Sequence, residues 1–266
     1  MKMPFEDILY EKKGNVAVAT FNRPDALNAV RQATINEFLE ILDDLRADDT
    51  LRVLILTGTG RAFSAGIDLA EMAGFFTDKI PLKPARDSLQ RMQDITRQMV
   101  NHPKTIISAV NGIAVGMGAE LAISSDIRIA SENATFSFAE VKRGLFETNG
   151  VIYFLPRLVG LGRAVEMMMT GEKIPAPEAL AAGLVTHVLP SDQLLDFTLG
   201  LAQKIASNAP IAVRLVKQTT RRTFDLDLEA VMQLEVDGMM ECLGSEDLME
   251  GILAFMQKRP PKYIGR

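Results

Sequence analysis

The spacing of apolar residues along the first 190 positions switches repeatedly between two patterns. Apolar spacing at three- and four-residue intervals over 35–45 and 88–100, and again from residue 120, predicts helices. Short apolar runs of the kind found in buried strands cover residues 5–11, 16–21, 53–56, 105–110 and 127–129. Strands that alternate with helices in this way predict an α/β fold.

Two prolines interrupt the stretch before the 88–100 helix. Pro81 and Pro84 have no backbone N–H to donate, and their rings clash with a preceding turn in a helix interior. We therefore expect residues 72–83 to form a mobile loop.

After residue 189 the strand pattern stops and only helical spacing remains. Residues 194–205 carry apolar side chains on one helix face, and three further helical segments follow up to residue 257. We therefore expect two parts, a core over 1–190 and a helical segment over 191–266. Because the second part has no strands from which to build a sheet-based core, its apolar faces must cover something else.

Composition and charge narrow the classes of function. The chain has 266 residues, of which 47% are hydrophobic and 24% charged, as in a globular protein with a sizeable core. No apolar run approaches the roughly 18 residues of a membrane span. None follows an early basic segment, so we expect neither a membrane partner nor a signal peptide. The net charge of −5 argues against a nucleic-acid partner.

Residues that bind metals or form disulfides are few. The single cysteine, Cys242, cannot form an internal disulfide, which favours a reducing compartment. The two histidines, His102 and His187, are far apart and lack the spacing of zinc ligands. We therefore expect a cytoplasmic protein without a metal site.

The run at residues 64–69 (SAGIDL) follows a strand and predicts a tight turn into a helix. Gly66 permits close backbone approach or a positive φ. Asp68 suits a helix start, where a carboxylate accepts hydrogen bonds from free N–H groups. The backbone N–H of Ile67 could then point at a ligand oxygen, although a capped turn without a ligand explains the same residues.

A second glycine-rich turn, at residues 111–121, leads from a strand into a helix. Such turns expose N–H groups beside a positive helix end and suit an anion, or an oxygen that becomes one. Gly116 and Gly118 begin a dinucleotide-binding fingerprint, but Leu121 occupies the third glycine position, which argues against that interpretation. Glu120 lies in the first helical turn, where glutamate commonly offsets the helix dipole.

Two acidic residues follow the segment around Phe138. Glu140 has apolar neighbours, so it is either exposed at a strand edge or buried with a chemical role. Burial would raise its pKa from about 4.3 toward neutrality, as a general acid requires. Glu147 lies in a loop bracketed by Gly144 and Gly150.

Together, and in this order, these motifs resemble the crotonase superfamily, also called the enoyl-CoA hydratase/isomerase family. The likeness spans essentially the whole chain. It also includes residues 22–29 (NRPDALNA), 158–164 (LVGLGRA), 180–185 (LAAGLV) and 255–259 (FMQKR). The combination is specific for the family but much less so for the reaction, because the family runs several reactions on one scaffold.

The resemblance implies a crotonase-like spiral of ββα turns, followed by a helical segment that builds homotrimers or hexamers. It also implies an acyl-CoA thioester as substrate, with no separate cofactor. The thioester oxygen would accept hydrogen bonds from the backbone N–H groups of Ile67 and Met117, which stabilise an enolate-like intermediate. Further substrate and CoA contacts map onto Ala26, Leu27, Ala65, Gly66, Asp68, Leu69, Gly116, Phe255 and Lys258.

Two carboxylates of the family hydratases map onto Glu120 and Glu140. Adding water to an enoyl thioester needs a base for the water and an acid for the α carbon. The resemblance thus implies an enoyl-CoA hydratase in which Glu120 activates water and Glu140 protonates the α carbon.

The chain departs from the family at residues 147–149 (ETN), where hydratases commonly carry proline and glycine. The extra carboxylate of Glu147 leaves a double-bond isomerase as an alternative, and a member that only binds CoA or RNA is another. Glu147 could enter the acyl pocket, or it could join Asn149 in capping the following helix. The capping position is favoured, because a charge in an apolar pocket needs a partner.

Overall fold

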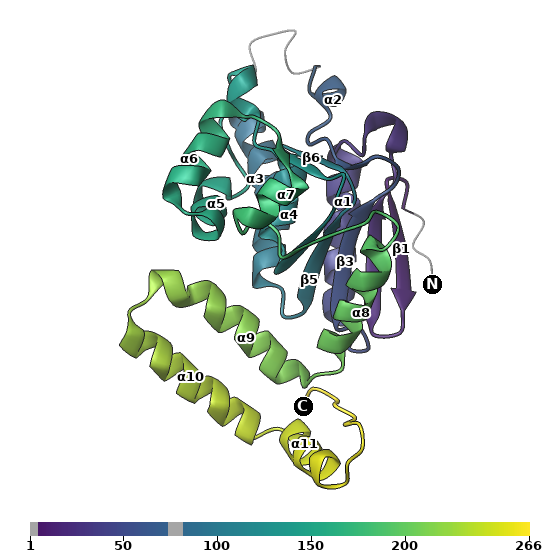
Figure 1. Cartoon of the computed structure of the whole chain (residues 1–266), viewed down its shortest axis with the longest axis vertical. Coiled ribbons are helices and arrows are strands. Elements are labelled where there is room, and N and C mark those ends of the chain that lie inside the picture. Colours follow the sequence, from purple (N-terminus) through teal and green to yellow (C-terminus); the bar gives the residue numbers. More distant parts are fainter. Residues whose placement is uncertain (1–4, 74–81) are drawn as a thin grey trace.

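The computed structural model describes residues 5–73 and 82–266, and two sheets form the centre of this part of the chain (Figure 1). The larger sheet has the strand order β1 (Ile8–Lys13), β2 (Val16–Phe21), β3 (Val53–Gly58), β5 (Thr105–Val110), β7 (Ile127–Ser131) and β10 (His187–Leu189). The smaller sheet has the order β4 (Ala62–Ser64), β6 (Ile113–Val115), β8 (Thr135–Ser137) and β9 (Ile174–Pro175). Among the described strands, β1–β2 and β8–β9 pair antiparallel and the other pairs are parallel.

The fold repeats a unit in which a strand of the large sheet, a strand of the small sheet and helical structure follow one another. The helical parts of the three units are α2 (Leu69–Ala73) with α3 (Leu82–Asn101), then α4 (Met117–Ser124), then η2 (Glu140–Arg143) with α5 (Val151–Val159). Because β4, β6 and β8 run parallel, the turns that follow them meet at one edge of the small sheet. The α/β prediction is confirmed, as is the ββα order that the resemblance implied.

Some element boundaries differ from those predicted. β1 begins at Ile8 rather than at residue 5, and α3 begins at Leu82 rather than at residue 88. Pro84 lies in the first turn of α3, where an N–H would have no intrahelical partner, so it does not interrupt the helix. The ends of the predicted 72–83 loop are therefore helical, and the rest of it lies outside the described residues.

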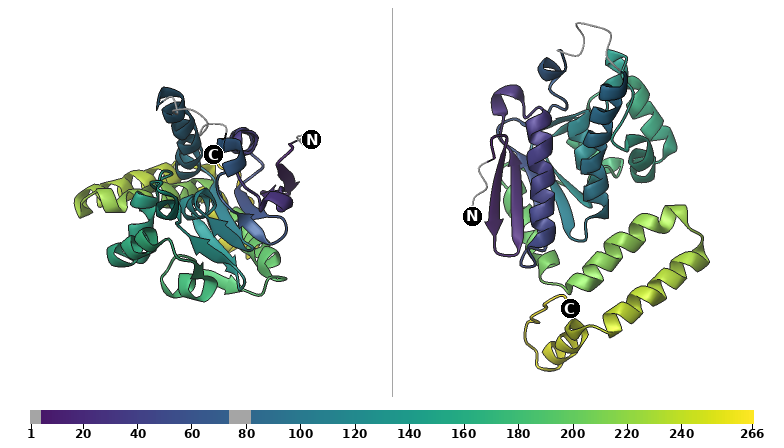
Figure 2. Two further views of the ribbon diagram at one scale, coloured as in Figure 1. Left: turned by 90° about the horizontal axis from the view of Figure 1, so that it is seen from above. Right: turned by 180° about the vertical axis from the view of Figure 1, so that it is seen from behind.

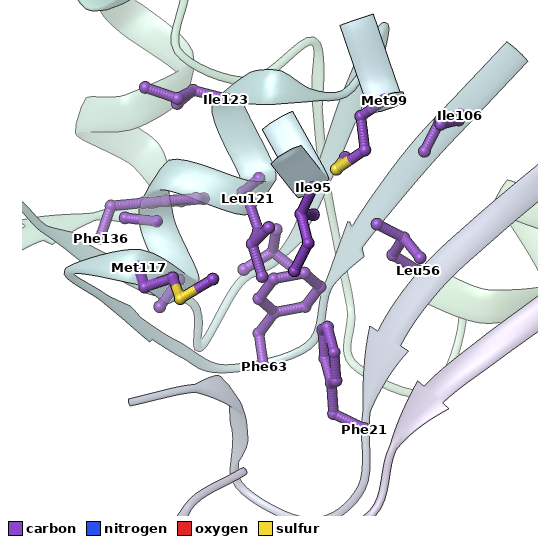
Figure 3. Close-up of a cluster of buried hydrophobic side chains, with 14 of the residues drawn as sticks. Phe21, Leu56, Phe63, Ile95, Met99, Ile106, Met117, Leu121, Ile123 and Phe136 are labelled. Atoms are coloured by element: carbon purple, nitrogen blue, oxygen red, sulfur yellow. The ribbon is translucent and has the colours of Figure 1, made fainter. Parts of the chain in front are cut away.

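A hydrophobic core fills the space between the sheets and the helices α1 (Gln32–Ala47) and α3 (Figure 3). Phe21 on β2 and Phe63 on β4 meet edge to face, with ring centroids 5.6 Å apart. Leu56 and Ile95 belong to the same buried cluster. Full burial of one such side chain contributes roughly 1.5–3 kcal/mol. The core therefore fixes β4, and the turn that follows it, relative to both sheets.

The helix α8 (Leu194–Ala206) covers the other face of the large sheet. Leu194 and Ala202 are buried in one cluster with Val53 and Ile107 of that sheet. The apolar face predicted over 194–205 is therefore covered by the chain's own strands. The two sheets and the helices packed on them, called the body below, thus extend past the predicted boundary at residue 190.

Three helices form an arm that projects from this body, namely α9 (Pro210–Arg222), α10 (Leu228–Leu243) and α11 (Glu246–Met256) (Figure 1 and Figure 2). A buried lysine ties the arm to the body. The Lys217 ammonium donates hydrogen bonds to the carbonyls of Met99 and Lys104 and lies 2.9 Å from Asp126 Oδ2. In contrast, α10 has no buried residue, and its exposed apolar side chains are Leu228, Met232, Val236, Met239, Met240 and Leu243.

Short elements complete the described part of the chain. These are η1 (Pro24–Ala26), α6 (Leu161–Thr170), α7 (Ala176–Ala181) and η3 (Thr223–Asp225). Across residues 5–73 and 82–266, we find no helix whose length and apolar content would allow it to cross a membrane.

Candidate active site

A cavity of about 130 Å³ opens where the turns after β4, β6 and β8 meet α3. Its wall is formed by Ala65, Gly66, Ile67, Leu69, Leu89, Val115, Gly116, Met117, Glu120, Ala139, Glu140, Arg143, Leu145, Phe146 and Thr148. The predicted site residues that the structure brings together here are Ala65, Gly66, Ile67, Leu69, Gly116, Met117, Glu120 and Glu140.

A larger cleft of about 740 Å³ lies between the body and α9 of the arm. Tyr153 and Leu158 of α5 form one side of it, and Val213 and Val216 of α9 form the other. None of the predicted site residues lines this cleft, so its size does not make it the candidate active site.

The first two turns of the cavity touch each other at Gly66. This residue has a φ of +90°, which side chains disfavour, and a Cβ here would lie 2.6 Å from the Val115 carbonyl oxygen. The same Cβ would lie 3.3 Å from the backbone nitrogen of Met117. Only glycine allows this approach, which places the Ile67 peptide next to the N-terminus of α4.

Two residues of the cavity wall, Ile67 and Met117, carry a backbone N–H group without a partner among the described residues. Val30 N–H donates to the Gly66 carbonyl at 2.7 Å, and Asp68 N–H donates to the Val30 carbonyl at 2.9 Å. Because successive N–H groups of an extended segment point to opposite sides, the Ile67 N–H faces away from Val30. Met117 begins α4, so its N–H has no intrahelical acceptor. Neither group donates a hydrogen bond to another described residue.

Three further predicted residues lie near the first turn but outside the cavity wall. Ala26 and Leu27 lie at η1, outside the cavity wall, and the Leu27 carbonyl accepts a hydrogen bond from Ala65 N–H at 2.9 Å. Asp68 accepts a hydrogen bond from Ala70 N–H at 3.1 Å, as a residue at a helix start does, and pairs with Arg23 at 2.9 Å. Although burial opposes it, the contact with Arg23 lowers the pKa of Asp68.

Glu120 lies in the first turn of α4 and is only 1% exposed. The Asn149 side-chain amide donates to its Oε2 at 2.7 Å, and Thr148 N–H donates to its Oε1 at 3.4 Å. Burial raises the pKa of Glu120 to about 7, and the bond from Asn149 opposes this shift. Glu120 can therefore take up or release a proton near neutral pH.

Glu140 begins η2, is half-buried and lines the cavity. The absence of a side chain at Gly116 makes room for it, because a Cβ there would lie 2.7 Å from Glu140 Oε1. Burial raises the pKa of Glu140, so the predicted direction of that shift agrees with the structure.

The structure corrects the capping position proposed for Glu147. The residue before α5 is Gly150, with a φ of +85° and no side-chain cap, and the Asn149 side chain bonds to Glu120 instead. Glu147 is only 5% exposed, and neither of its carboxylate oxygens has a hydrogen-bond partner among the described residues. Burial, followed by the charges of Glu140 and Glu120, raises the pKa of Glu147 to about 8.

Glu120, Glu140 and Glu147 form one carboxyl cluster, in which an oxygen of each lies within 4.8 Å of an oxygen of the other two. Like charges at this separation disfavour full ionisation, so the cluster suits proton transfer near neutral pH.

Phe255 and Lys258 lie on the arm rather than at the cavity. Phe255 is 86% exposed and borders a separate groove that also involves Cys242 and Tyr263. Within one chain, the structure does not bring these two residues to the other predicted site residues.

Sequence reasoning missed the residues that hold Glu120 in place. In the sequence, Thr148 stood out only as part of a departure from the family pattern, and Asn149 also as a candidate helix cap, yet both donate hydrogen bonds to this carboxylate. The available signal was the amide side chain of Asn149, in a segment where hydratases commonly carry proline and glycine. Leu89, Leu145 and Phe146 of the cavity wall gave no signal in the sequence.

Comparisons with known proteins agree with this geometry. The sequence profile of the enoyl-CoA hydratase/isomerase family matches residues 11–266. The short-chain-enoyl-CoA hydratase of Clostridium acetobutylicum is 38% identical over 97% of both chains, and the crotonyl-CoA hydratase of Syntrophomonas wolfei is 36% identical over 99% of this chain and 100% of the relative. The crystal structure of the Bacillus anthracis enoyl-CoA hydratase is 35% identical, with a TM-score of 0.93 over 98% of this chain and 100% of that chain. The chain therefore belongs to the enoyl-CoA hydratase/isomerase family.

Proposed function

We propose that this chain is an enoyl-CoA hydratase, which adds water across the double bond of a 2-enoyl-CoA thioester. The observation that carries the proposal is one cavity in which the free N–H groups of Ile67 and Met117 lie beside the carboxyl groups of Glu120 and Glu140. The two relatives named as hydratases support the same reaction.

The two N–H groups bind the thioester oxygen. Attack of water on the β carbon moves electrons toward this oxygen, which becomes negatively charged in an enolate-like intermediate. Ile67 and Met117 are fixed by the Val30 contact and by the start of α4, so their N–H groups need no rearrangement to stabilise that charge. One such donor is typically worth roughly 3–4 kcal/mol of the activation barrier.

The two carboxyl groups move the protons. Glu120 accepts a proton from water as the oxygen bonds to the β carbon, and Glu140 donates a proton to the α carbon. The pair gains one proton and loses one, so its total charge is unchanged after the reaction. The pKa of Glu120, raised by burial to about 7, suits a group that exchanges protons near neutral pH.

The remaining substrate contacts extend this proposal. Coenzyme A enters as part of the substrate, with no separate cofactor, and contacts the segment around Ala26 and Leu27 and the turn at residues 65–69. Phe255 and Lys258 contact coenzyme A from a neighbouring subunit of a homotrimer or hexamer. The exposed apolar side chains of α10 and the cleft beside α9 support an assembly of this kind. The single cysteine favours the cytoplasm as its location.

A double-bond isomerase is the second candidate, and the observation that favours it is the third carboxyl group, that of Glu147. An isomerase moves a proton between the α and γ carbons and takes up no water. The two reactions are separated by supplying crotonyl-CoA and a 3-enoyl-CoA to the purified protein and identifying the products. Formation of 3-hydroxybutyryl-CoA supports hydration. Conversion of the 3-enoyl ester to the 2-enoyl ester without any hydroxyacyl product would show an isomerase instead of the proposed hydratase.

A further inference from the structure

Glu147 is a buried carboxyl group that the proposed hydration does not use. It is 95% removed from solvent, and unlike Glu140 it does not line the cavity. Both of its oxygens lack a hydrogen-bond donor among the described residues. A carboxylate in such a place would lose its hydration without compensation, so the neutral acid is the stable form.

The surroundings of Glu147 decide where a proton in the cluster resides. Glu120 faces it from α4, but the N–H groups of Thr148 and Asn149 stabilise the ionised form of Glu120. Glu140 faces it from η2, is half-buried, and feels the exposed cation Arg143.

From α3, two neutral side chains bond to the residues that follow Glu147. Gln93 donates a hydrogen bond to the carbonyl of Thr148, and Thr96 donates one to the carbonyl of Asn149. The charges that act on Glu147 are the negative ones of Glu140 and Glu120, which together with its burial raise its pKa to about 8.

We propose that Glu147 is a positioning residue that shares one proton with Glu140 across their buried contact, and that it thereby keeps the acid of the hydration step supplied with a proton. A protonated Glu147 donates its O–H to the Glu140 carboxylate, which also holds that side chain in the orientation that lines the cavity. The role in turnover rests on the proposed function, whereas the shared proton does not.

The carboxyl cluster gains and loses the same number of protons over one turnover. The cluster begins with one proton, shared by Glu140 and Glu147. Glu140 transfers it to the α carbon while Glu120 takes a proton from water, so the cluster still holds one proton. That proton returns from Glu120 to the Glu140–Glu147 pair across a separation of no more than 4.8 Å.

The first test needs no substrate. The protein is labelled with ¹³C at the glutamate side-chain carboxyls, and their chemical shifts are followed against pH, with Glu140→Gln and Glu147→Gln to assign the signals. We expect the pair to titrate in two separated steps, one of them above neutral pH, and we expect the upper step to vanish in Glu147→Gln. A wild-type protein in which no signal assigned to Glu140 or Glu147 titrates above neutral pH overturns the proposal.

The second test uses the pH dependence of hydration. In Glu147→Gln, the alkaline limb of kcat should move to lower pH by about one unit or more, with KM for crotonyl-CoA nearly unchanged. Glu132→Gln, which changes an exposed glutamate on the turn between β7 and β8, is the matched control and should leave the profile unaltered. An unaltered profile in Glu147→Gln, or a change confined to acyl preference, overturns the proposal. A normal two-step titration in a protein that does not hydrate crotonyl-CoA refutes the proposed function and leaves the shared proton standing.

Discussion

Replacing Gly116 by alanine tests the geometry that joins the two halves of the site. Gly116 precedes α4 with a φ of +51° and a ψ of −126°, a conformation that a side chain strongly disfavours. The new Cβ would lie 2.7 Å from Glu140 Oε1, so the carboxylate has to retreat by about 0.7 Å to restore an ordinary 3.4 Å contact. Alternatively, the peptide shifts and carries the Met117 N–H with it. Either movement displaces a group that the proposed reaction uses.

We expect Gly116→Ala to lose about 1–3 kcal/mol of unfolding free energy through backbone strain. Because a displacement on the order of 1 Å can lower a rate about 100-fold, kcat for crotonyl-CoA should fall by one to two orders of magnitude. Urea unfolding and the loss of enoyl absorbance measure the two effects. Gly14→Ala is the control, since Gly14 has a φ of +62° in the β1–β2 turn and no atom within 4 Å of the added Cβ. It should lose about 1–2 kcal/mol and keep its kcat. A folded Gly116→Ala protein with full kcat would refute the reasoning.

Other predictions concern stability, substrate affinity and assembly. Burial raises the pKa values of Glu120 and Glu147 to about 7 and about 8, above the usual 4.5. The protonated carboxyl groups therefore stabilise the folded protein fully below about pH 4.5, and this stabilisation is lost as the pH rises to about 8. The melting temperature of Glu147→Gln should therefore rise relative to that of the wild type as the pH increases across this range. A difference in melting temperature that does not change with pH contradicts the raised pKa of Glu147. Lys217→Ala leaves the carbonyls of Met99 and Lys104 without the buried ammonium, while Asp126 keeps its pair with Arg221. It should cost about 1–3 kcal/mol in urea unfolding, whereas the exposed Lys204→Ala should change little. Lys258→Ala should raise KM for CoA esters with little change in kcat, and an unchanged KM points to a solvated lysine. Light scattering should give a trimer or hexamer, and a stable monomer at micromolar concentration contradicts the proposed assembly.

The larger elements of the fold could be predicted from the sequence because their periodicity is long enough to recognise. The runs at 53–56 and 105–110 became β3 and β5, and the 35–45 pattern became α1. The strands β4, β6 and β9 are only two or three residues long, too short for a pattern to emerge. They exist because strands from distant segments bond to them, which local sequence does not reveal.

The candidate site was predictable where the chemistry lies in one short segment. Gly66, Gly116 and Glu120 each belong to a strand-to-helix turn whose residues indicate exposed N–H groups, and the structure brings these turns together. Glu147 was misplaced because its position before a helix indicated a cap, whereas tertiary packing buries it beside Glu120 and Glu140 from other elements. Local sequence does not tell which distant carboxyl groups will meet.

The central claim is that two carboxyl groups act as one unit on one water molecule, and the most direct test is hydration of crotonyl-CoA by Glu120→Gln, Glu140→Gln and the double variant. Each single variant should stay folded and lose several orders of magnitude in kcat. The double variant should lose little more than either single variant, because removing one member already disables the unit. Near-full hydratase activity in folded Glu120→Gln, or losses in the single variants that multiply in the double variant, would contradict the account.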